Sequence, residues 1–185
     1  MKTIKLISAV LFAPHILFQS ALLQAAPHVH GEADLTIAME ADRVQVQFMA
    51  PASDVVGFEH SATSPEQQQT LNNARDILSE STNVFVFTGG ECEISKINID
   101  MSGLENTKHD AHEHESTKAH DHQHAHPNIT ATYDFNCRRL QQLSSLNMNV
   151  FDVFPTISRV NGMWVSEHLQ GSKVLSIQDR QLRFK

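Results

Sequence analysis

The sequence predicts an α+β fold: a mainly antiparallel sheet with one or two packed helices and a long disordered histidine-rich loop. Three observations predict it. Several short segments alternate apolar and polar residues, which is the period of a half-buried strand. One segment carries a full set of helix-start residues. A stretch at about 101–127 has no usable periodicity and no large apolar run, so it has nothing to bury against the entropy of ordering its backbone.

The first 25 residues are predicted to be a secretory signal peptide and not part of the fold. Two lysines precede an apolar run (6–23) that ends in the small residues Ala25 and Ala26. The run is too short and too interrupted for a membrane span. Cleavage after Ala25 leaves residues 26–185, which we expect to form a single soluble, exported domain that is not embedded in a membrane.

The charge of the chain is acidic. Its formal net charge is −7, with 14 basic and 21 acidic residues, and loss of Lys2 and Lys5 with the signal peptide makes it −9. This balance argues against nucleic acid or an anionic membrane as a partner and favours cations. Solubility alone explains the charge nearly as well.

The first elements of the mature chain are a hairpin and a helix. Apolar and polar residues alternate over 34–39 and 43–48, with a turn near Ala41-Asp42. The stretch 51–63 is expected to be irregular. Ser64 is then a capping residue, with proline next and Gln67 three positions after it, so a helix is predicted to run to about Glu80 and to lie on the sheet.

Further strands follow the helix. Segments 84–87 and 91–99, joined by Gly89-Gly90, are predicted to form a second hairpin with a bulge between Ile94 and Ile97. Alternation over 129–137 predicts another strand. A short helix is expected at 138–146, buried packing at 151–154, and one or two strands at 157–177, for which Asn161-Gly162 and Gln170-Gly171 are competing turn positions.

Cys92 and Cys137 are the only cysteines. An even pair in an exported chain most often forms a disulfide, and closing a loop of this length would stabilise the fold by roughly 3–4 kcal/mol. Metal ligation by thiolates is the weaker alternative, because an oxidising compartment removes thiolates.

Histidines are concentrated in the aperiodic stretch between the two cysteines. Imidazoles at such density favour binding of divalent transition metal ions, with modest affinity because the chain must be ordered on binding. A solvated linker that buffers protons is the alternative. The candidate metal ligands are His109, His112, His114, His120, His122, His124 and His126.

A second candidate metal site lies at the mature N-terminus. His28 and His30 are spaced by two, so they share one side of an extended segment. If His60 approaches this pair, three nitrogens with Glu32 or Glu59 would complete a tetrahedral site. Any single one of these side chains could equally be an ordinary surface group.

Imidazole with occasional carboxylate fits Zn(II) best, and Cu(II) or Ni(II) remain possible. If cleavage follows Ala25, those two ions cannot form a square-planar site at the N-terminus. Such a site needs a deprotonated amide at the second residue, and Pro27 has no amide hydrogen to lose. The alternatives to zinc capture are therefore a copper or nickel chaperone and, less favoured, a zinc hydrolase built on the N-terminal candidates. No HExxH-like helix or nucleophile elbow supports the hydrolase.

Four features in order resemble the ZrgA-type periplasmic zinc-binding proteins. They are His28-Val29-His30-Gly31-Glu32-Ala33-Asp34-Leu35, Ala50-Pro51-Ala52 before Val56-Gly57-Phe58-Glu59-His60, the histidine loop between the two cysteines, and 151–155. The resemblance covers essentially the whole mature chain. It implies a non-enzymatic, zinc-binding accessory in the periplasm of a Gram-negative bacterium that supports a periplasmic or inner-membrane zinc transporter.

Overall fold

The computed structural model describes residues 29–105 and 126–184. Six strands form a larger sheet in the order β4-β5-β2-β1-β7-β8, and three form a smaller sheet, β3-β6-β9. All paired neighbours are antiparallel except β1 and β7. The predicted mainly antiparallel α+β fold is confirmed. The strands are β1 (Glu32–Glu40), β2 (Arg43–Pro51), β3 (Phe85–Thr88), β4 (Cys92–Asp100), β5 (Asn128–Cys137), β6 (Ser145–Met148), β7 (Arg159–Val165), β8 (Gln170–Ser176) and β9 (Gln181–Arg183).

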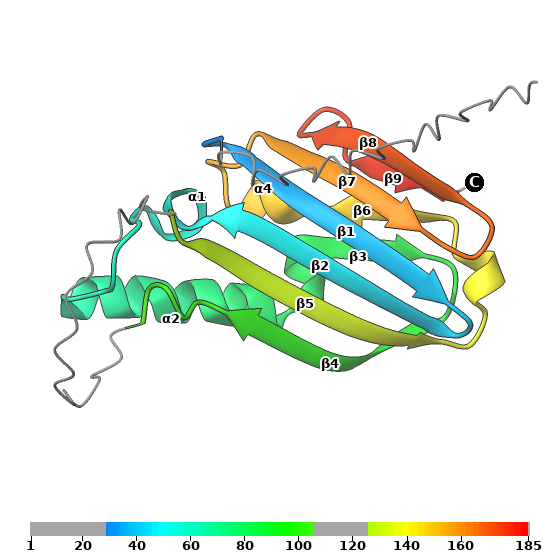
Figure 1. Cartoon of the computed structure of the whole chain (residues 1–185), viewed down its shortest axis with the longest axis horizontal. Coiled ribbons are helices and arrows are strands. Elements are labelled where there is room, and N and C mark those ends of the chain that lie inside the picture. The colour runs from blue at the N-terminus through cyan, green and yellow to red at the C-terminus, as the bar shows by residue number, and fades with distance from the viewer. Residues whose placement is uncertain (1–28, 106–125, 185) are drawn as a thin grey trace, which may run out of the picture.

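The larger sheet covers the core with one face only. Alternate residues of its strands, such as Leu35, Val46 and Ala131, are fully buried, while their chain neighbours point to the outer face. Figure 1 shows α2 and the smaller sheet behind this sheet, on its buried face. The short helices α1 (Ala52–Val56), α3 (Ser81–Val84) and α4 (Val150–Val153) and the 3-10 turn η1 (Leu140–Gln142) join these layers.

The helix α2 (Pro65–Ser79) begins and packs as predicted. Its capping box is complete, because Gln67 N donates to Ser64 Oγ (3.2 Å) and Ser64 N donates to Gln67 Oε1 (3.3 Å). One face of the helix is buried. The Tyr133 hydroxyl of β5 donates to the carbonyl of Leu78 (2.8 Å), which fixes the end of α2 on the sheet.

The predicted second hairpin is wrong. β3 pairs with β6, and β4 pairs with β5 over a much longer ladder, with the predicted bulge after Ile94. The reason is packing: Phe85 of β3 is buried edge-on against Tyr133 and Phe135, so β3 lies beneath the larger sheet and not at its edge. Gly89 and Gly90, both with positive φ, carry the chain from one sheet to the other.

Three smaller predictions also differ from the structure. The stretch expected to be irregular contains α1, and 138–146 forms η1 and the start of β6 in place of one helix. The β7–β8 turn uses neither candidate pair, because it lies at 166–169, where Ser166 N donates to Leu169 O (2.7 Å). Gly162 is instead a close-packing position within β7: a Cβ there would lie 2.7 Å from Leu182 Cδ1 of the smaller sheet.

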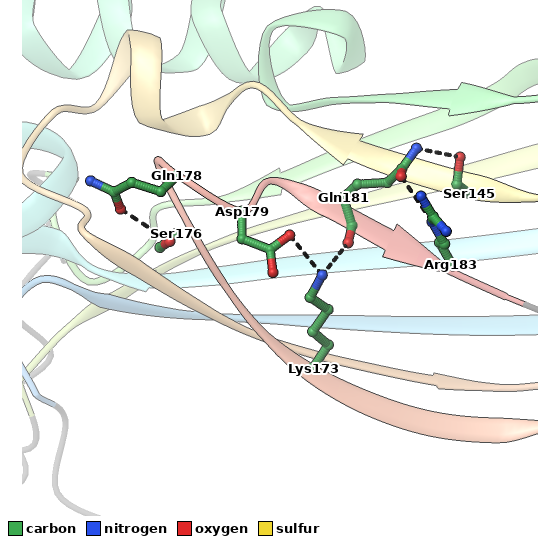
Figure 2. A network of polar contacts seen from close by, with 7 residues as sticks. All are labelled: Ser145, Lys173, Ser176, Gln178, Asp179, Gln181 and Arg183. Atoms are coloured by element: carbon green, nitrogen blue, oxygen red, sulfur yellow. Dashed lines mark hydrogen bonds and ion pairs between the residues drawn. The ribbon is translucent and has the colours of Figure 1, made fainter.

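A polar network connects the two sheets at their C-terminal strands (Figure 2). Lys173 of β8 donates through Nζ to Asp179 Oδ1 (2.7 Å) and to the carbonyl of Gln181 in β9 (2.8 Å). Gln181 in turn donates from Nε2 to Ser145 Oγ of β6 (3.3 Å). The contacts link an edge of the larger sheet to the smaller one.

The predicted disulfide is present. Cys92 and Cys137 are directly paired across β4 and β5, and Cys137 points into the core. The bridge lies at one end of this strand pair, and Asp100 and Asn128 lie at the other end. The histidine-rich stretch follows β4 and precedes β5 in the sequence, so it lies within the loop that the disulfide closes. Within the described residues, no helix is long and apolar enough to cross a membrane.

Candidate metal centre

Three segments that are distant in sequence meet at one end of the larger sheet. The strand register places the start of β1, the end of β2 and the start of β5 side by side, with Pro51 opposite Asn128 and Asp34 opposite Met49. α1 follows β2 directly, at the left of Figure 1. This end therefore collects the turn that carries His30, α1 with the residues after it, and the described residues that precede β5.

The turn that carries His30 is held by its backbone. Gly31 N donates to Oδ2 of the buried Asp54 in α1 (2.7 Å), and the Gly31 carbonyl accepts from the backbone N–H groups of Ser158 (2.9 Å) and Arg159 (3.1 Å). Gly31 has a φ of 80°, which a side chain would strain. The turn is thus attached both to α1 and to the strand β7.

α1 and the residues after it bring a carboxylate to His30. The helix ends at Gly57, whose φ of 84° reverses the chain and whose N–H donates to the carbonyl of Ser53 (3.0 Å). Glu59 then lies beside the helix, and Ser53 Oγ donates to Glu59 Oε1 (2.9 Å). His30 Nδ1 lies 2.9 Å from the same Ser53 Oγ.

His126, two residues before β5, contacts the second carboxylate oxygen of Glu59. Its neighbour Pro127 accepts a backbone hydrogen bond from Ala52 N (2.9 Å), which attaches this segment to the start of α1. His126 Nδ1 contacts Glu59 Oε2 in an ion pair or hydrogen bond. We call His30, Ser53, Glu59 and His126 the junction network, since a continuous chain of contacts runs through all four.

The electrostatics of the network favour an ionised Glu59. The hydroxyl of Ser53 is the main cause that holds the pKa of this carboxyl below its ordinary value; partial burial opposes the shift, and His126 and His30 add to it. The side chain of Glu59 is 21% exposed, whereas that of His126 is 61% exposed. A negative group is therefore enclosed between two imidazoles that face solvent.

The structure places the other candidates outside this network. Glu32 forms an ion pair with Arg159 (2.7 Å). His60, the conditional third nitrogen of the N-terminal site, has Nδ1 3.0 Å from the carbonyl of Ser61, and its ring stacks on Phe58. The remaining candidate ligands lie outside the described residues: His28, His109, His112, His114, His120, His122 and His124.

The junction network is not a complete metal site by itself. Over residues 29–105 and 126–184, no group of three or more His, Cys, Asp and Glu side chains could hold a metal ion. The network brings together two histidines and one carboxylate, and a zinc site built on them would need further donors. Sequence reasoning missed Ser53 and Asp54, because a serine and an aspartate at a helix start are ordinary capping residues.

The chain matches a known protein family. The family model described as ZrgA family zinc uptake protein matches residues 27–184. A comparison with curated proteins finds no match. The matched range contains the whole junction network, both cysteines and every strand described above.

Proposed function

The chain belongs to the ZrgA family of zinc uptake proteins, and from this premise we propose that it is a non-enzymatic periplasmic protein that captures Zn(II) and supports its uptake by a transporter. Zinc is the cargo in this proposal. The predicted signal peptide supports the export, and the acidic charge supports attraction of cations over nucleic acid.

The observation that carries the proposal is the junction network. It joins an N-terminal histidine to the last histidine of the dense stretch through a single carboxylate. His30 and His126 are 96 positions apart in the sequence, yet both reach Glu59 at one end of the larger sheet, His126 directly and His30 through Ser53. Folding thus brings together two imidazoles, which Zn(II) prefers as donors alongside thiolate.

We propose that His30 and His126 supply two ligands to one zinc ion. The remaining donors come from His28, from the histidines of 109–124 or from water, since four-coordinate sites are the rule for zinc in proteins. The same stretch would gather further ions with lower affinity, because each ion must order its own set of ligands.

Zinc binding to the mature protein tests the proposal. Equilibrium dialysis followed by metal analysis should find more than one zinc per chain. A variant with asparagine at all six positions His109, His112, His114, His120, His122 and His124 should bind fewer zinc ions per chain. A protein that retains no zinc at neutral pH would refute the proposal.

A pair of variants tests the location of the tighter site. His30→Gln with His126→Gln should lower the zinc affinity by more than about 100-fold, because loss of an outer-shell partner alone costs about 10–100-fold. The matched control is His168→Gln, which changes an exposed histidine at the β7–β8 turn and should leave the affinity unchanged. Equal affinities in the double variant and the control would place the ion elsewhere.

Export and uptake need separate measurements. Fractionation should recover the protein in the periplasm without residues 1–25, and a deletion strain should grow more slowly only when zinc is scarce. Competition among Zn(II), Cu(II) and Ni(II) separates this function from that of a copper or nickel chaperone, which would show selective retention of one of the other two ions.

A further inference from the structure

We infer that Glu59 is not a zinc ligand but a positioning residue, which fixes the protons of His30 and His126 so that each imidazole binds zinc through Nε2. The inference rests on the proposed function, in which these two histidines hold the ion. It follows from the direction of three hydrogen bonds in the junction network.

The proton of His30 is fixed by Ser53. The Ser53 hydroxyl has a single hydrogen, and it is donated to Glu59 Oε1 (2.9 Å). Ser53 Oγ can therefore only accept from His30 Nδ1, which lies 2.9 Å away. The Nδ1 atom of His30 carries the proton, and in a neutral imidazole the lone pair that can bind a metal is then on Nε2.

The proton of His126 is fixed by Glu59 itself. An ionised carboxylate only accepts hydrogen bonds, so the contact of Glu59 Oε2 with His126 Nδ1 requires a proton on that nitrogen as well. Within the part of the chain that the structure describes, neither His30 nor His126 forms a hydrogen bond or an ion pair through Nε2.

Glu59 is engaged through both of its oxygens. Each already accepts from a donor, Ser53 at Oε1 and His126 at Oε2. A histidine that ligates zinc usually donates its other N–H to a carboxylate or a similar group, which fixes the ring and strengthens the ligand. Glu59 has this relation to His126 directly and to His30 through the Ser53 hydroxyl. A nitrogen-based site of this kind favours zinc over Mg²⁺ and Ca²⁺, which prefer oxygen ligands.

Nitrogen NMR of the mature protein, labelled on histidine and assigned with the His30→Gln and His126→Gln variants, tests the inference. Without metal, at a pH of about 8 where imidazoles are ordinarily neutral, both residues should carry the proton on Nδ1. Addition of zinc should shift the Nε2 resonance of each. A proton on Nε2 in the zinc-free protein, or zinc on Nδ1, would overturn the inference.

Two variants separate positioning from ligation. The amide of Glu59→Gln has one acceptor and one donor, whereas Ser53 and His126 need two acceptors. The zinc affinity should therefore fall by about 10–100-fold. At least one of the two histidines should also lose its preference for carrying the proton on Nδ1. Ser53→Ala should remove that preference at His30 and leave it at His126. The control Glu80→Gln removes the same charge from an exposed position and should change neither readout.

The results distinguish this inference from the proposed function. If the unchanged protein binds no zinc, the proposed function fails. If zinc binds but contacts a Glu59 oxygen, or if Glu59→Gln binds zinc as tightly as the unchanged protein, only the positioning role of Glu59 fails.

Discussion

Replacing Asp54 with alanine should both destabilise the protein and weaken zinc binding at the proposed site. The Asp54 side chain is 4% exposed and accepts from Gly31 N at 2.7 Å, so the change leaves a backbone donor of the His30 turn without its partner. An orphaned, partly buried donor costs about 1–3 kcal/mol, and a bond to a charged acceptor lies in the upper part of that range. Relief from burying a carboxylate offsets part of the loss. We therefore expect a decrease of about 2 kcal/mol in the free energy of unfolding.

Urea denaturation followed through the fluorescence of Trp164, the only tryptophan, measures this decrease. The melting temperature should fall by about 4–8 °C, given about 2–4 °C per kcal/mol for a chain of this size. Asp54→Asn keeps an acceptor oxygen, so its free energy of unfolding should fall by about half as much as that of Asp54→Ala. Asp76→Ala, on the exposed face of α2, should stay within about 0.5 kcal/mol of the unchanged protein. If Asp54→Ala is as stable as Asp76→Ala and binds zinc equally well, the bond to Gly31 does not hold the turn.

Three further measurements test the fold. Tyr133→Phe removes the donor to the Leu78 carbonyl and should cost about 1–2 kcal/mol in urea denaturation; a smaller loss than the scatter of the measurement would contradict the hydrogen bond. Burial also raises the pKa of Tyr133 in the folded protein. The neutral phenol therefore makes its whole contribution to the free energy of unfolding below the unfolded-state pKa of about 10, and this contribution is lost as the pH rises above that value. Because Tyr133 is the only tyrosine, its ultraviolet absorbance should show phenolate only as the protein unfolds, and ionisation of the native protein near pH 10 would refute this. Replacing Cys92 and Cys137 by alanine should lower the free energy of unfolding by about 3–4 kcal/mol, and an unchanged midpoint would show that the bridge does not constrain the unfolded chain.

Short-range sequence patterns correctly predicted the elements that depend on residues close together in the sequence. The first hairpin, α2 and β5 followed from alternation and from the capping box, because these depend on residues that are adjacent or one turn apart. The pairings β3–β6 and β1–β7 could not be predicted, since they depend on which buried faces meet in the folded chain. A four-residue strand such as β3 has no periodicity long enough to select a partner.

The candidate site was predictable in its residue types and not in its arrangement. His30, Glu59 and His126 were among the candidate ligands by residue type and spacing, but only the folded arrangement of the strands brings them to the same end of the sheet. Ser53 could not be identified, because its role depends on a hydroxyl placed between His30 and Glu59 by α1.

A structure of the mature protein grown with zinc, with anomalous scattering to identify the ion, tests the central claim most directly. We predict one zinc about 2.0–2.1 Å from Nε2 of both His30 and His126, with Glu59 hydrogen-bonded to His126 and to Ser53 and not to the metal. An ion bound only by other residues, or no zinc at this end of the sheet, would contradict the claim.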